Sequence, residues 1–220
     1  MRVAGADEKK DSSRRHFDRW ARRYESDAVS RWLATLQEAA LDALALERDE
    51  RLLDVGCGTG AAVRLAAPAV ERAVGVDLSA AMIARGRELA ARLPNVELRE
   101  GDAEALPFDD GAFTAALCTT SLHHYPQPER AIAEIARVLA PGGRAVIGDW
   151  TTDRFAVRVF DLLLRHLQPS HVGCQRAADL ERLLSAAGLG EPQVRSLFDG
   201  AYAIVSARKP RLGALGESPA

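Results

Sequence analysis

The amino-acid sequence predicts an α/β fold in which a doubly wound, mostly parallel sheet ends in an antiparallel hairpin at one edge. Short apolar runs alternate with helical stretches between residues 51 and 150, as is typical of βαβ units with helices on both faces of a parallel sheet. Two further strand-like runs, residues 192–198 and 201–209, lie on either side of Asp199-Gly200. Because Asp-Gly is a strong signal for a two-residue turn, these runs are expected to form the hairpin.

Two helical patterns precede the first strand. Phe17, Trp20, Ala21 and Tyr24 are spaced i, i+3, i+4, i+7 and so share one helix face, and a second pattern covers residues 29–44. The aromatic face has two interpretations, which can hold together. Either it packs on the main domain, or the two helices form a lid over a site in that domain.

The remaining elements follow in order, and they divide the chain. Strands are expected at residues 51–56, 72–77, 96–100, 113–118 and 143–150, with helices at 61–67, 79–93, 128–139 and 178–189. The last helix has a glycine stop at Gly188. The resulting organisation is an N-terminal helical segment or lid (1–48), a main domain (49–210) and a loose tail (211–220).

Composition excludes several classes of function. The 220 residues carry a formal net charge of −2, so the whole molecule offers no general affinity for nucleic acid. Residues 1–24 hold eight Lys/Arg against four Asp/Glu, which indicates either a solvated, partly disordered tail or a contact with an acidic partner. Three widely spaced cysteines and the lack of a signal peptide or a long apolar run predict a cytoplasmic protein without stable membrane insertion.

A glycine-rich loop follows the first strand in "LLDVGCGTG" and opens a helix. Ligands of open parallel sheets bind beyond the carboxyl ends of the strands, which is where Gly56, Gly58 and Gly60 lie. With Ala61 the loop also satisfies the dinucleotide fingerprint, and Asp77, 21 residues after Gly56, suits the hydroxyls of a ribose. These features leave three alternatives open: a dinucleotide, another adenosine ligand, or a tight turn that binds nothing.

Three further features favour a nucleoside that carries an amino acid. Asp54 lies two residues before the first glycine, where a carboxylate suits an ammonium group and would repel a pyrophosphate. Asp102 follows the third strand, in position to accept a hydrogen bond from an adenine amino group. The chain also ends soon after a single sheet, which leaves no room for a separate substrate domain.

The chain resembles the class I S-adenosylmethionine-dependent methyltransferases, in the branch of the ubiquinone/menaquinone-type small-molecule enzymes. The resemblance covers about residues 50–190. Its motifs are "LLDVGCGTG", "GVDLSAAMIARGRE", "GDAEALPFDDGAFTAAL", "LHHYPQPERAIAEIARVLAPGGRAVI" and "AADLERLLSAAGL". It implies a Rossmann-like, seven-stranded sheet with an antiparallel final strand, S-adenosyl-L-methionine as cofactor, and a small-molecule acceptor.

The resemblance also implies the residues that hold the methionine end of the cofactor. Asp54 would orient the loop and the ammonium group, and Tyr24 would reach the same end from the lid. Cys118 and Thr119 would face the sulfonium through backbone carbonyls. The loop residues that would line the methionine part are Gly56, Cys57, Gly58 and Gly60.

The adenosine end is assigned in the same way. Asp77 would hold the ribose and Leu78 would pack on the adenine. Asp102 would accept from the adenine amino group, while the backbone N–H of Ala103 would donate to a ring nitrogen.

Methyl transfer from a sulfonium requires an aligned nucleophile but no nucleophilic protein residue. A general base helps only where the acceptor has a proton to lose, and His123 and His124 in "SLHHYP" are the candidates for this catalytic role. The alternative for both is capping or packing of the loop. No metal site is predicted, because no carboxylate or cysteine accompanies the pair at ligand spacing.

The acceptor is expected to be apolar or aromatic. The family places its substrate cap at about residues 151–176, where an apolar helix face is predicted from Phe155, Val159, Phe160, Leu163 and Leu164. An aromatic ring, a phenol or a polyketide-like molecule would suit such a face. No basic groove with interleaved aromatics indicates nucleic acid.

Two other functions stay open at this stage. One is a protein that binds S-adenosylmethionine without catalysis. The other, favoured only by the fingerprint and Asp77, is an NAD-dependent oxidoreductase. The oligomeric state is expected to be a monomer or a homodimer.

Overall fold

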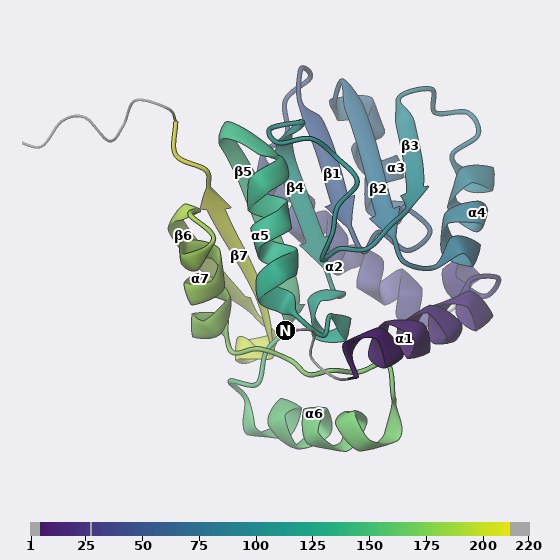
Figure 1. Cartoon of the computed structure of the whole chain (residues 1–220), viewed down its shortest axis with the longest axis vertical. Helices are drawn as coiled ribbons and strands as arrows, with labels where there is room; N and C mark the ends of the chain where they lie inside the picture. Colours follow the sequence, from purple (N-terminus) through teal and green to yellow (C-terminus); the bar gives the residue numbers. More distant parts are fainter. Residues whose placement is uncertain (1–4, 27, 212–220) are drawn as a thin grey trace, which may run out of the picture.

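The computed structural model describes residues 5–26 and 28–211 of the chain (Figure 1). Its centre is a seven-stranded sheet in the order β3-β2-β1-β4-β5-β7-β6, parallel throughout except that β7 runs antiparallel to both β5 and β6. The predicted fold class is therefore confirmed. The strands are β1 (Arg51–Val55), β2 (Arg72–Asp77), β3 (Val96–Glu100), β4 (Phe113–Thr119), β5 (Leu139–Trp150), β6 (Gly190–Leu197) and β7 (Tyr202–Arg208).

Helices cover both faces of this sheet. The helices are α1 (Ala6–Trp20), α2 (Ala28–Leu44), α3 (Ala61–Ala66), α4 (Ala80–Leu89), α5 (Pro128–Val138), α6 (Phe155–Leu167) and α7 (Ala177–Ala186). Short 3₁₀ turns lie at Tyr24–Ser26, Ala67–Ala69, Leu122–His124 and Phe198–Gly200. In Figure 1, α5 and α7 lie in front of the sheet, and α2 and α3 lie behind it.

The core explains why the central strands are apolar throughout. Successive side chains of a strand point to opposite faces, so Leu53 of β1 packs in the cluster formed with α5 and α7, whereas Leu52 packs in the cluster formed with α2. Both side chains are fully buried. The sequence of a strand that is buried on both faces is a continuous hydrophobic run rather than an alternation of apolar and polar residues.

The order of strands reverses between β1 and β4, because the chain builds outward through β2 and β3 before it returns to β4. This reversal creates the switch point at which such sheets bind their ligands. In Figure 1, α1 and α6 both lie at the carboxyl ends of these strands. No helix in the described residues is long and apolar enough to cross a membrane.

The N-terminal segment corrects one expectation. Residues 6–20 form α1 instead of a solvated, partly disordered tail, and the predicted helix of residues 14–24 both begins and ends earlier, with Tyr24 in a separate 3₁₀ turn. Periodicity missed the first half of α1 because "ADEKKDSS" has no apolar repeat. Within this half, Lys10 pairs with Asp102 and Glu104 of the main domain, and the local sequence does not reveal these partners.

The edge hairpin is confirmed, but its connection is longer than the two residues expected. The connection comprises residues 198–201, one residue more on each side than expected, because Leu197 pairs with Tyr202, and positive φ angles are found at Phe198 (49°), Asp199 (56°) and Gly200 (87°). The ring of Phe198 packs 5.7 Å from that of Trp32 in α2, which accounts for the position of this residue outside β6. Of the tail predicted at 211–220, only residue 211 lies within the described residues.

Candidate functional site

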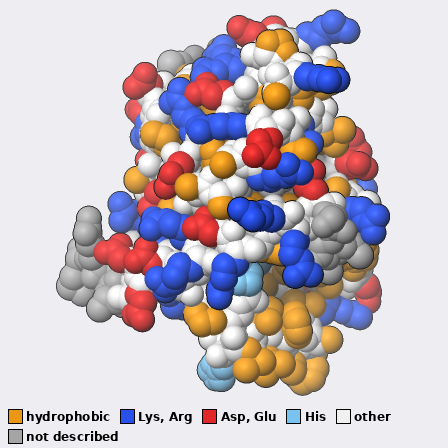
Figure 2. Space-filling view, turned by 90° about the vertical axis from the view of Figure 1, so that its right-hand side faces the viewer, with side chains coloured by type: hydrophobic (Ala, Val, Ile, Leu, Met, Phe, Trp, Pro, Cys, Tyr) orange, Lys and Arg blue, Asp and Glu red, His pale blue; other side chains and the backbone are white. Residues whose placement is uncertain are grey.

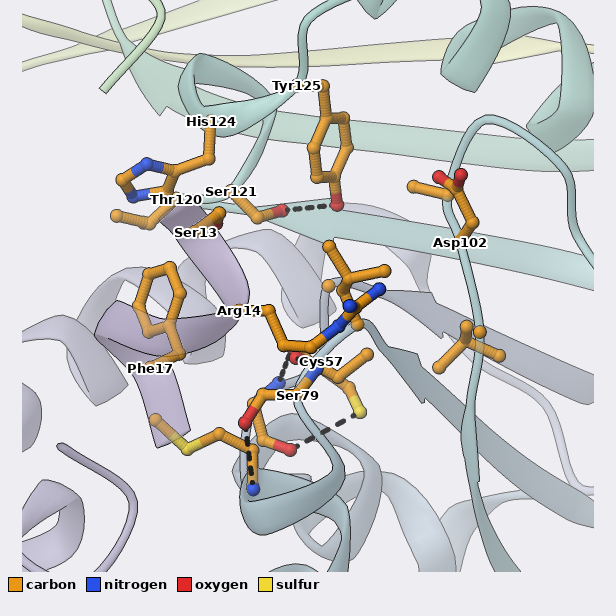
Figure 3. A pocket seen from close by; sticks show the side chains of 18 of the residues that line it. Ser13, Arg14, Phe17, Cys57, Ser79, Asp102, Thr120, Ser121, His124 and Tyr125 are labelled. Atoms are coloured by element: carbon orange, nitrogen blue, oxygen red, sulfur yellow. Dashed lines mark hydrogen bonds between the residues drawn. The ribbon is translucent and has the colours of Figure 1, made fainter. Parts of the chain in front are cut away.

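A pocket opens at the switch point, between the loops that follow β1, β2, β3 and β4 and the two N-terminal helices (Figure 3). Its empty space is about 900 Å³, with the solvent at its mouth included. The sheet side is lined by residues 56–58, 76–79, 101–104 and 119–121. The helical side is lined by Lys10, Ser13, Arg14, Phe17, Tyr24, Leu33 and Gln37.

Most of the site residues predicted from the sequence line this pocket. Those that line it are Tyr24, Gly56, Cys57, Gly58, Asp77, Leu78, Asp102, Ala103, Thr119 and His124. Those that do not line it are Asp54, Gly60, Cys118 and His123. The local sequence pattern therefore indicates loops that meet at one pocket, but it does not separate the side chains that face the pocket from those behind its wall.

The glycine loop needs its glycines for two different reasons. Gly56, Gly58 and Gly60 all have positive φ angles, at 73°, 56° and 74°. A Cβ atom at Gly56 would lie 2.4 Å from Oη of Tyr125, and one at Gly60 would lie 2.9 Å from a methyl group of Leu98. At Gly58 the nearest atoms, 3.9 Å away, belong to the ring of Tyr24. Packing and conformation together demand glycine at the outer two positions, whereas the requirement at Gly58 is conformational alone.

Asp77 joins this loop to the end of β2. One of its carboxylate oxygens accepts the backbone N–H of Gly58 at 2.8 Å, and the other accepts that of Ser79 at 2.9 Å. Burial raises the pKa of Asp77, while these two hydrogen bonds act to lower it. Each carboxylate oxygen has a further lone pair, so Asp77 can still accept hydrogen bonds from a ligand in the pocket.

Asp54 is the most unusual group of the site. Its side chain is 1% exposed, and neither carboxylate oxygen has a hydrogen-bond partner among the described residues. Burial, together with repulsion from Asp77, raises the pKa of Asp54 to about 7. A buried carboxylate without a donor is costly, and a cation or a donor placed beside it would relieve that cost.

Tyr24 covers the loop from the N-terminal segment. Its ring lies over Gly58, and it packs edge-on against Trp20 at a centroid distance of 4.9 Å. Burial and the nearby charges of Asp77 and Asp54 raise the pKa of Tyr24 to about 12. The phenol therefore stays protonated at neutral pH and is available as a hydrogen-bond donor.

The other end of the pocket is closed by an ion pair that the sequence did not predict. Nζ of Lys10 in α1 lies 2.7 Å from Asp102 and 2.5 Å from Glu104. The second oxygen of Asp102 accepts the backbone N–H of Glu104. Of the basic residues in the N-terminal segment, Lys10 therefore contacts acidic residues of the same chain. Leu78 and Ala103 form apolar wall at this end.

Two further contacts fasten the N-terminal segment over the pocket. Asp18 accepts the hydroxyl of Ser79 at 2.5 Å, and Ser79 in turn caps the N-terminus of α4. Glu25 accepts the hydroxyl of Thr59 at 2.9 Å and pairs with Arg64. With Lys10, these residues hold α1 and the turn after it at three separate points.

The wall after β4 differs in detail from the prediction. Cys118 is fully buried, and its Sγ lies 3.2 Å from Oγ of Ser121. Thr120 and Ser121 line the pocket beside Thr119, and Oγ of Ser121 also accepts the hydroxyl of Tyr125 at 3.1 Å (Figure 3). These hydroxyl groups are not predicted from the sequence, because serine and threonine in a loop give no distinct signal.

His124 faces the pocket in a fixed tautomer. Its Nδ1 lies 2.8 Å from the backbone carbonyl oxygen of Ser170, which can only accept, so Nδ1 carries the proton and Nε2 has a free lone pair. Burial, with a contribution from His123, lowers the pKa of His124 well below its usual value. The ring packs edge-on against Phe17 of α1 at 5.0 Å.

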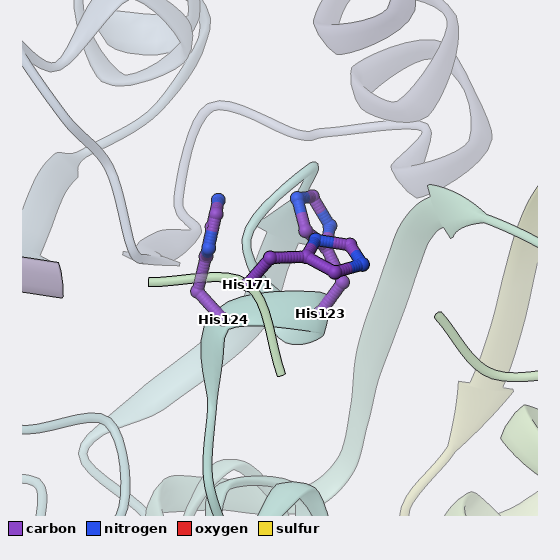
Figure 4. A group of neighbouring side chains, drawn as sticks. All are labelled: His123, His124 and His171. Atoms are coloured by element: carbon purple, nitrogen blue, oxygen red, sulfur yellow. The ribbon is translucent and has the colours of Figure 1, made fainter. Parts of the chain in front are cut away.

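His123 lies behind this ring and is held by Asp149 at the end of β5. Its Nδ1 is 2.7 Å from one carboxylate oxygen, and its backbone N–H donates to the other at 2.9 Å. His171 approaches the pair from the segment after α6, with its Nε2 2.8 Å from Asp161 (Figure 4). One ring nitrogen from each histidine lies within 4.8 Å of the others.

The histidine cluster (His123, His124 and His171) is thus oriented by three acceptors, namely two buried carboxylates and one carbonyl. No carboxylate is predicted beside the histidine pair from the sequence, because Asp149 and Asp161 are distant in the chain. The three rings share one chemical feature: each uses one nitrogen in a hydrogen bond and leaves the other available. His124 is the member of the cluster that lines the pocket.

The fold and the pocket together define the class of protein: an α/β protein with a ligand site at the switch point of a doubly wound sheet. Comparisons with known proteins narrow this class. A family model described as a methyltransferase domain matches residues 53–147. The crystal structure of the YcgJ protein from Bacillus subtilis, 21% identical, superposes with a TM-score of 0.70 over 80% of this chain and 99% of that one, and so shares the fold.

Two relatives extend over most of the chain. A demethylmenaquinone methyltransferase of Clavibacter sepedonicus is 32% identical over 192 residues, which are 78% of each protein. A 27-O-demethylrifamycin SV methyltransferase of Amycolatopsis mediterranei is 33% identical over 184 residues, 79% of this chain and 57% of that protein. Across the curated relatives that it matches, the chain spans from 46% to 78% of their length. The chain belongs to the class I S-adenosylmethionine-dependent methyltransferases.

Proposed function

We propose that this protein binds S-adenosylmethionine in the pocket and transfers its methyl group to a small, apolar or aromatic acceptor. The observation that carries the proposal is Asp54, a buried carboxylate without a donor directly before the glycine loop. The ammonium group of a bound methionine would supply the missing positive charge. A pyrophosphate in the same place would be repelled, which disfavours a dinucleotide.

The remaining residues fit the other parts of this cofactor. The backbone of Gly56 and Gly58 would lie against its amino-acid end, and Asp77 would hold the ribose. Leu78 would pack on the adenine, with Asp102 and the N–H of Ala103 at its polar edge. Tyr24, Cys57 and Thr119, which also line the pocket, complete the proposed binding set. When bound, the cofactor supplies an activated methyl group on a sulfonium.

The protein's own part in the reaction is to align the acceptor, exclude water and take up a proton. His124 presents the free lone pair of Nε2 on the pocket side and is the proposed general base for an acceptor with a hydroxyl group. His123, locked to Asp149, packs against the His124 ring at a centroid distance of 4.1 Å and supports its position. The acceptor class is supported by the relatives named for demethylmenaquinone and 27-O-demethylrifamycin SV.

The N-terminal helices act as a lid in this proposal. Lys10, Asp18 and Glu25 fasten them across the pocket, so the lid must open before the cofactor enters. A lid that closes over the sulfonium would exclude water during transfer. The ion pair of Lys10 with Asp102 lies where the adenine would bind, so its opening accompanies cofactor binding.

The test is titration calorimetry of the purified protein with S-adenosylhomocysteine and, in parallel, with NADH. Micromolar binding of the first and none of the second is expected. Binding of NADH alone would show that the interpretation of Asp54 is wrong. Asp77→Ala is the matched variant: it should abolish binding of S-adenosylhomocysteine while the far-UV circular dichroism spectrum stays unchanged.

A further inference from the structure

Helix α6 is oriented with its apolar side away from the protein. Asp161 is its one buried residue, at 3% exposed. The large apolar side chains are open to solvent, from 50% exposed at Val159 and Leu163 to 81% at Phe155. Figure 2 shows hydrophobic side chains gathered at the lower end of the molecule, the end where Figure 1 places α6.

The helix is amphipathic, but it turns its polar face to the domain, whereas a helix that packs on a globular core turns its apolar face inward. Arg154, Arg158, Asp161 and Arg165 are spaced i, i+4, i+7, i+11 and form one polar stripe that begins at the N-cap. The buried Asp161 shows that this stripe faces the domain. The outer face of α6, on the other side, consists of Phe155, Val159, Phe160, Leu162, Leu163 and Leu167.

One anchor holds the helix in this orientation. The carboxylate of Asp161 accepts the backbone N–H of Cys174 at 2.7 Å, pairs with His171 at 2.8 Å and pairs with Arg165 of the next turn at 2.8 Å. These contacts fix the polar stripe to the segment that returns toward α7. The outward position of the apolar side chains is therefore built into the fold, and the pocket described above is lined by none of them.

The charged groups of α6 beside its outer face are mainly basic. Arg158 is exposed, while Arg154 pairs with Asp199 and Arg165 pairs with Asp161. The single acidic residue of α6 is the buried Asp161. Basic side chains on the polar side of a helix and Phe and Leu on the other are the pattern of a helix that lies in a membrane interface.

A second basic element lies beside the end of this helix. Arg19, Trp20 and Arg23, which belong to α1 and the turn after it, share a surface hollow with Gln168, the residue directly after α6. Basic and aromatic groups of α1 and of the turn after it therefore lie beside the C-terminal end of α6. Such groups bind anionic headgroups and settle at the boundary between headgroups and acyl chains.

We infer that the outer face of α6 docks the protein on an anionic phospholipid surface. The six apolar side chains would enter the interface, and the exposed Arg158 at the border of the polar stripe would reach the headgroups. At 13 residues the helix is too short to span a bilayer, so it would lie on the surface. A second copy is a poor occupant, because the outer face has no exposed acidic residue on α6 to complement its basic border. The inference does not depend on methyl transfer.

The test is co-sedimentation of the full-length protein with vesicles at low ionic strength. Binding to vesicles of equal parts phosphatidylglycerol and phosphatidylcholine should be at least about tenfold tighter than to phosphatidylcholine alone, and Arg158→Glu should weaken it about tenfold. The double variant Phe155→Ser/Phe160→Ser should also weaken binding at least about tenfold. Leu65→Ser is the matched control, since Leu65 is a comparably exposed residue (52%) on α3.

Both substituted phenylalanines are exposed, so thermal unfolding should be unchanged in the double variant. No binding to the anionic vesicles, or equal binding by the wild type and the double variant, would overturn the inference. Analytical ultracentrifugation measures the oligomeric state of the wild type and of the double variant. A dimer that is lost in the double variant, with no vesicle binding, would assign the outer face to a second copy and likewise overturn it.

Discussion

Nζ of Lys10 lies 2.7 Å from a carboxylate oxygen of Asp102, and this contact joins α1 to the loop after β3 across 92 residues of sequence. Asp102 is also the residue to which we assign the adenine amino group. In the proposed function the lid and the cofactor would therefore share one carboxylate, and Asp102 would exchange its partner when the cofactor enters. This relationship leads to the first prediction.

Lys10→Met is expected to accelerate the association of S-adenosylhomocysteine about fivefold, because an ion pair of this exposure contributes about 1 kcal/mol to keeping the lid closed. Stopped-flow measurement of tryptophan fluorescence provides the rate, since Trp20 lies at the end of the lid helix. Lys9→Met is the matched control, a neighbouring lysine that is exposed. An unchanged or slower rate in Lys10→Met would refute the role of this pair as a latch.

Two substitutions in the glycine loop should differ in their cost. Gly58→Ala has space for its methyl group and is expected to lower Tm by about 2–8 °C, through a backbone strain of about 1–2 kcal/mol. Gly56→Ala adds a clash with Tyr125 and Ser121 to the same strain and should lower Tm further. Thermal unfolding followed by circular dichroism gives both values. Equal shifts would show that the packing around Gly56 can yield.

Asp54→Asn should stabilise the folded protein and weaken ligand binding. The pKa of Asp54 is raised from 3.8 to about 7 in the folded state, so the folded protein holds this proton more tightly than the unfolded chain. The free energy of unfolding therefore falls as pH rises from about 4 to about 7. Removing the charge should raise the free energy of unfolding by about 2–4 kcal/mol above pH 7 and by almost nothing near pH 4.

Urea unfolding at pH 4 and pH 8 measures this difference, and calorimetry measures the loss of function. The same variant should bind S-adenosylhomocysteine at least tenfold more weakly, because an amide cannot neutralise an ammonium group. A gain in stability that is equal at both pH values would show that the charge of Asp54 is not its cause. Unchanged affinity would remove Asp54 from the binding site.

His124→Gln should leave cofactor binding within about twofold and lower methyl transfer to a phenolic acceptor by about 10²–10⁴. Because burial lowers the pKa of His124, its imidazole stays neutral down to acidic pH. The acid limb of kcat/KM in the wild type should therefore lie below pH 6.5. His166→Gln, at an exposed histidine of α6, is the control and should keep full activity. A comparable loss in both variants would argue against a base at His124.

The fold could be predicted from the sequence because its determinants are local. Alternating runs set strands and helices, and the positive φ angles of Gly56, Gly58 and Gly60 are a property of glycine itself. The topology then followed, since the strand order of a doubly wound sheet brings the loops after β1, β2 and β4 to one edge. The same geometry places Asp77 after β2 and Asp102 after β3 at the pocket, as the sequence predicts, whereas Thr119 is predicted there only through the resemblance to the family.

Only the tertiary structure decided which polar groups meet. Lys10 and Asp102, like Asp161 and His171, are brought together by the packing of separate elements. No local pattern encodes such partners, because a charged or imidazole side chain in a loop looks the same whether it is solvated or paired. The orientation of the outer face of α6 is also decided by the tertiary structure. Its sequence determines an amphipathic helix, but the buried contacts of one carboxylate, Asp161, decide which side of that helix meets the solvent.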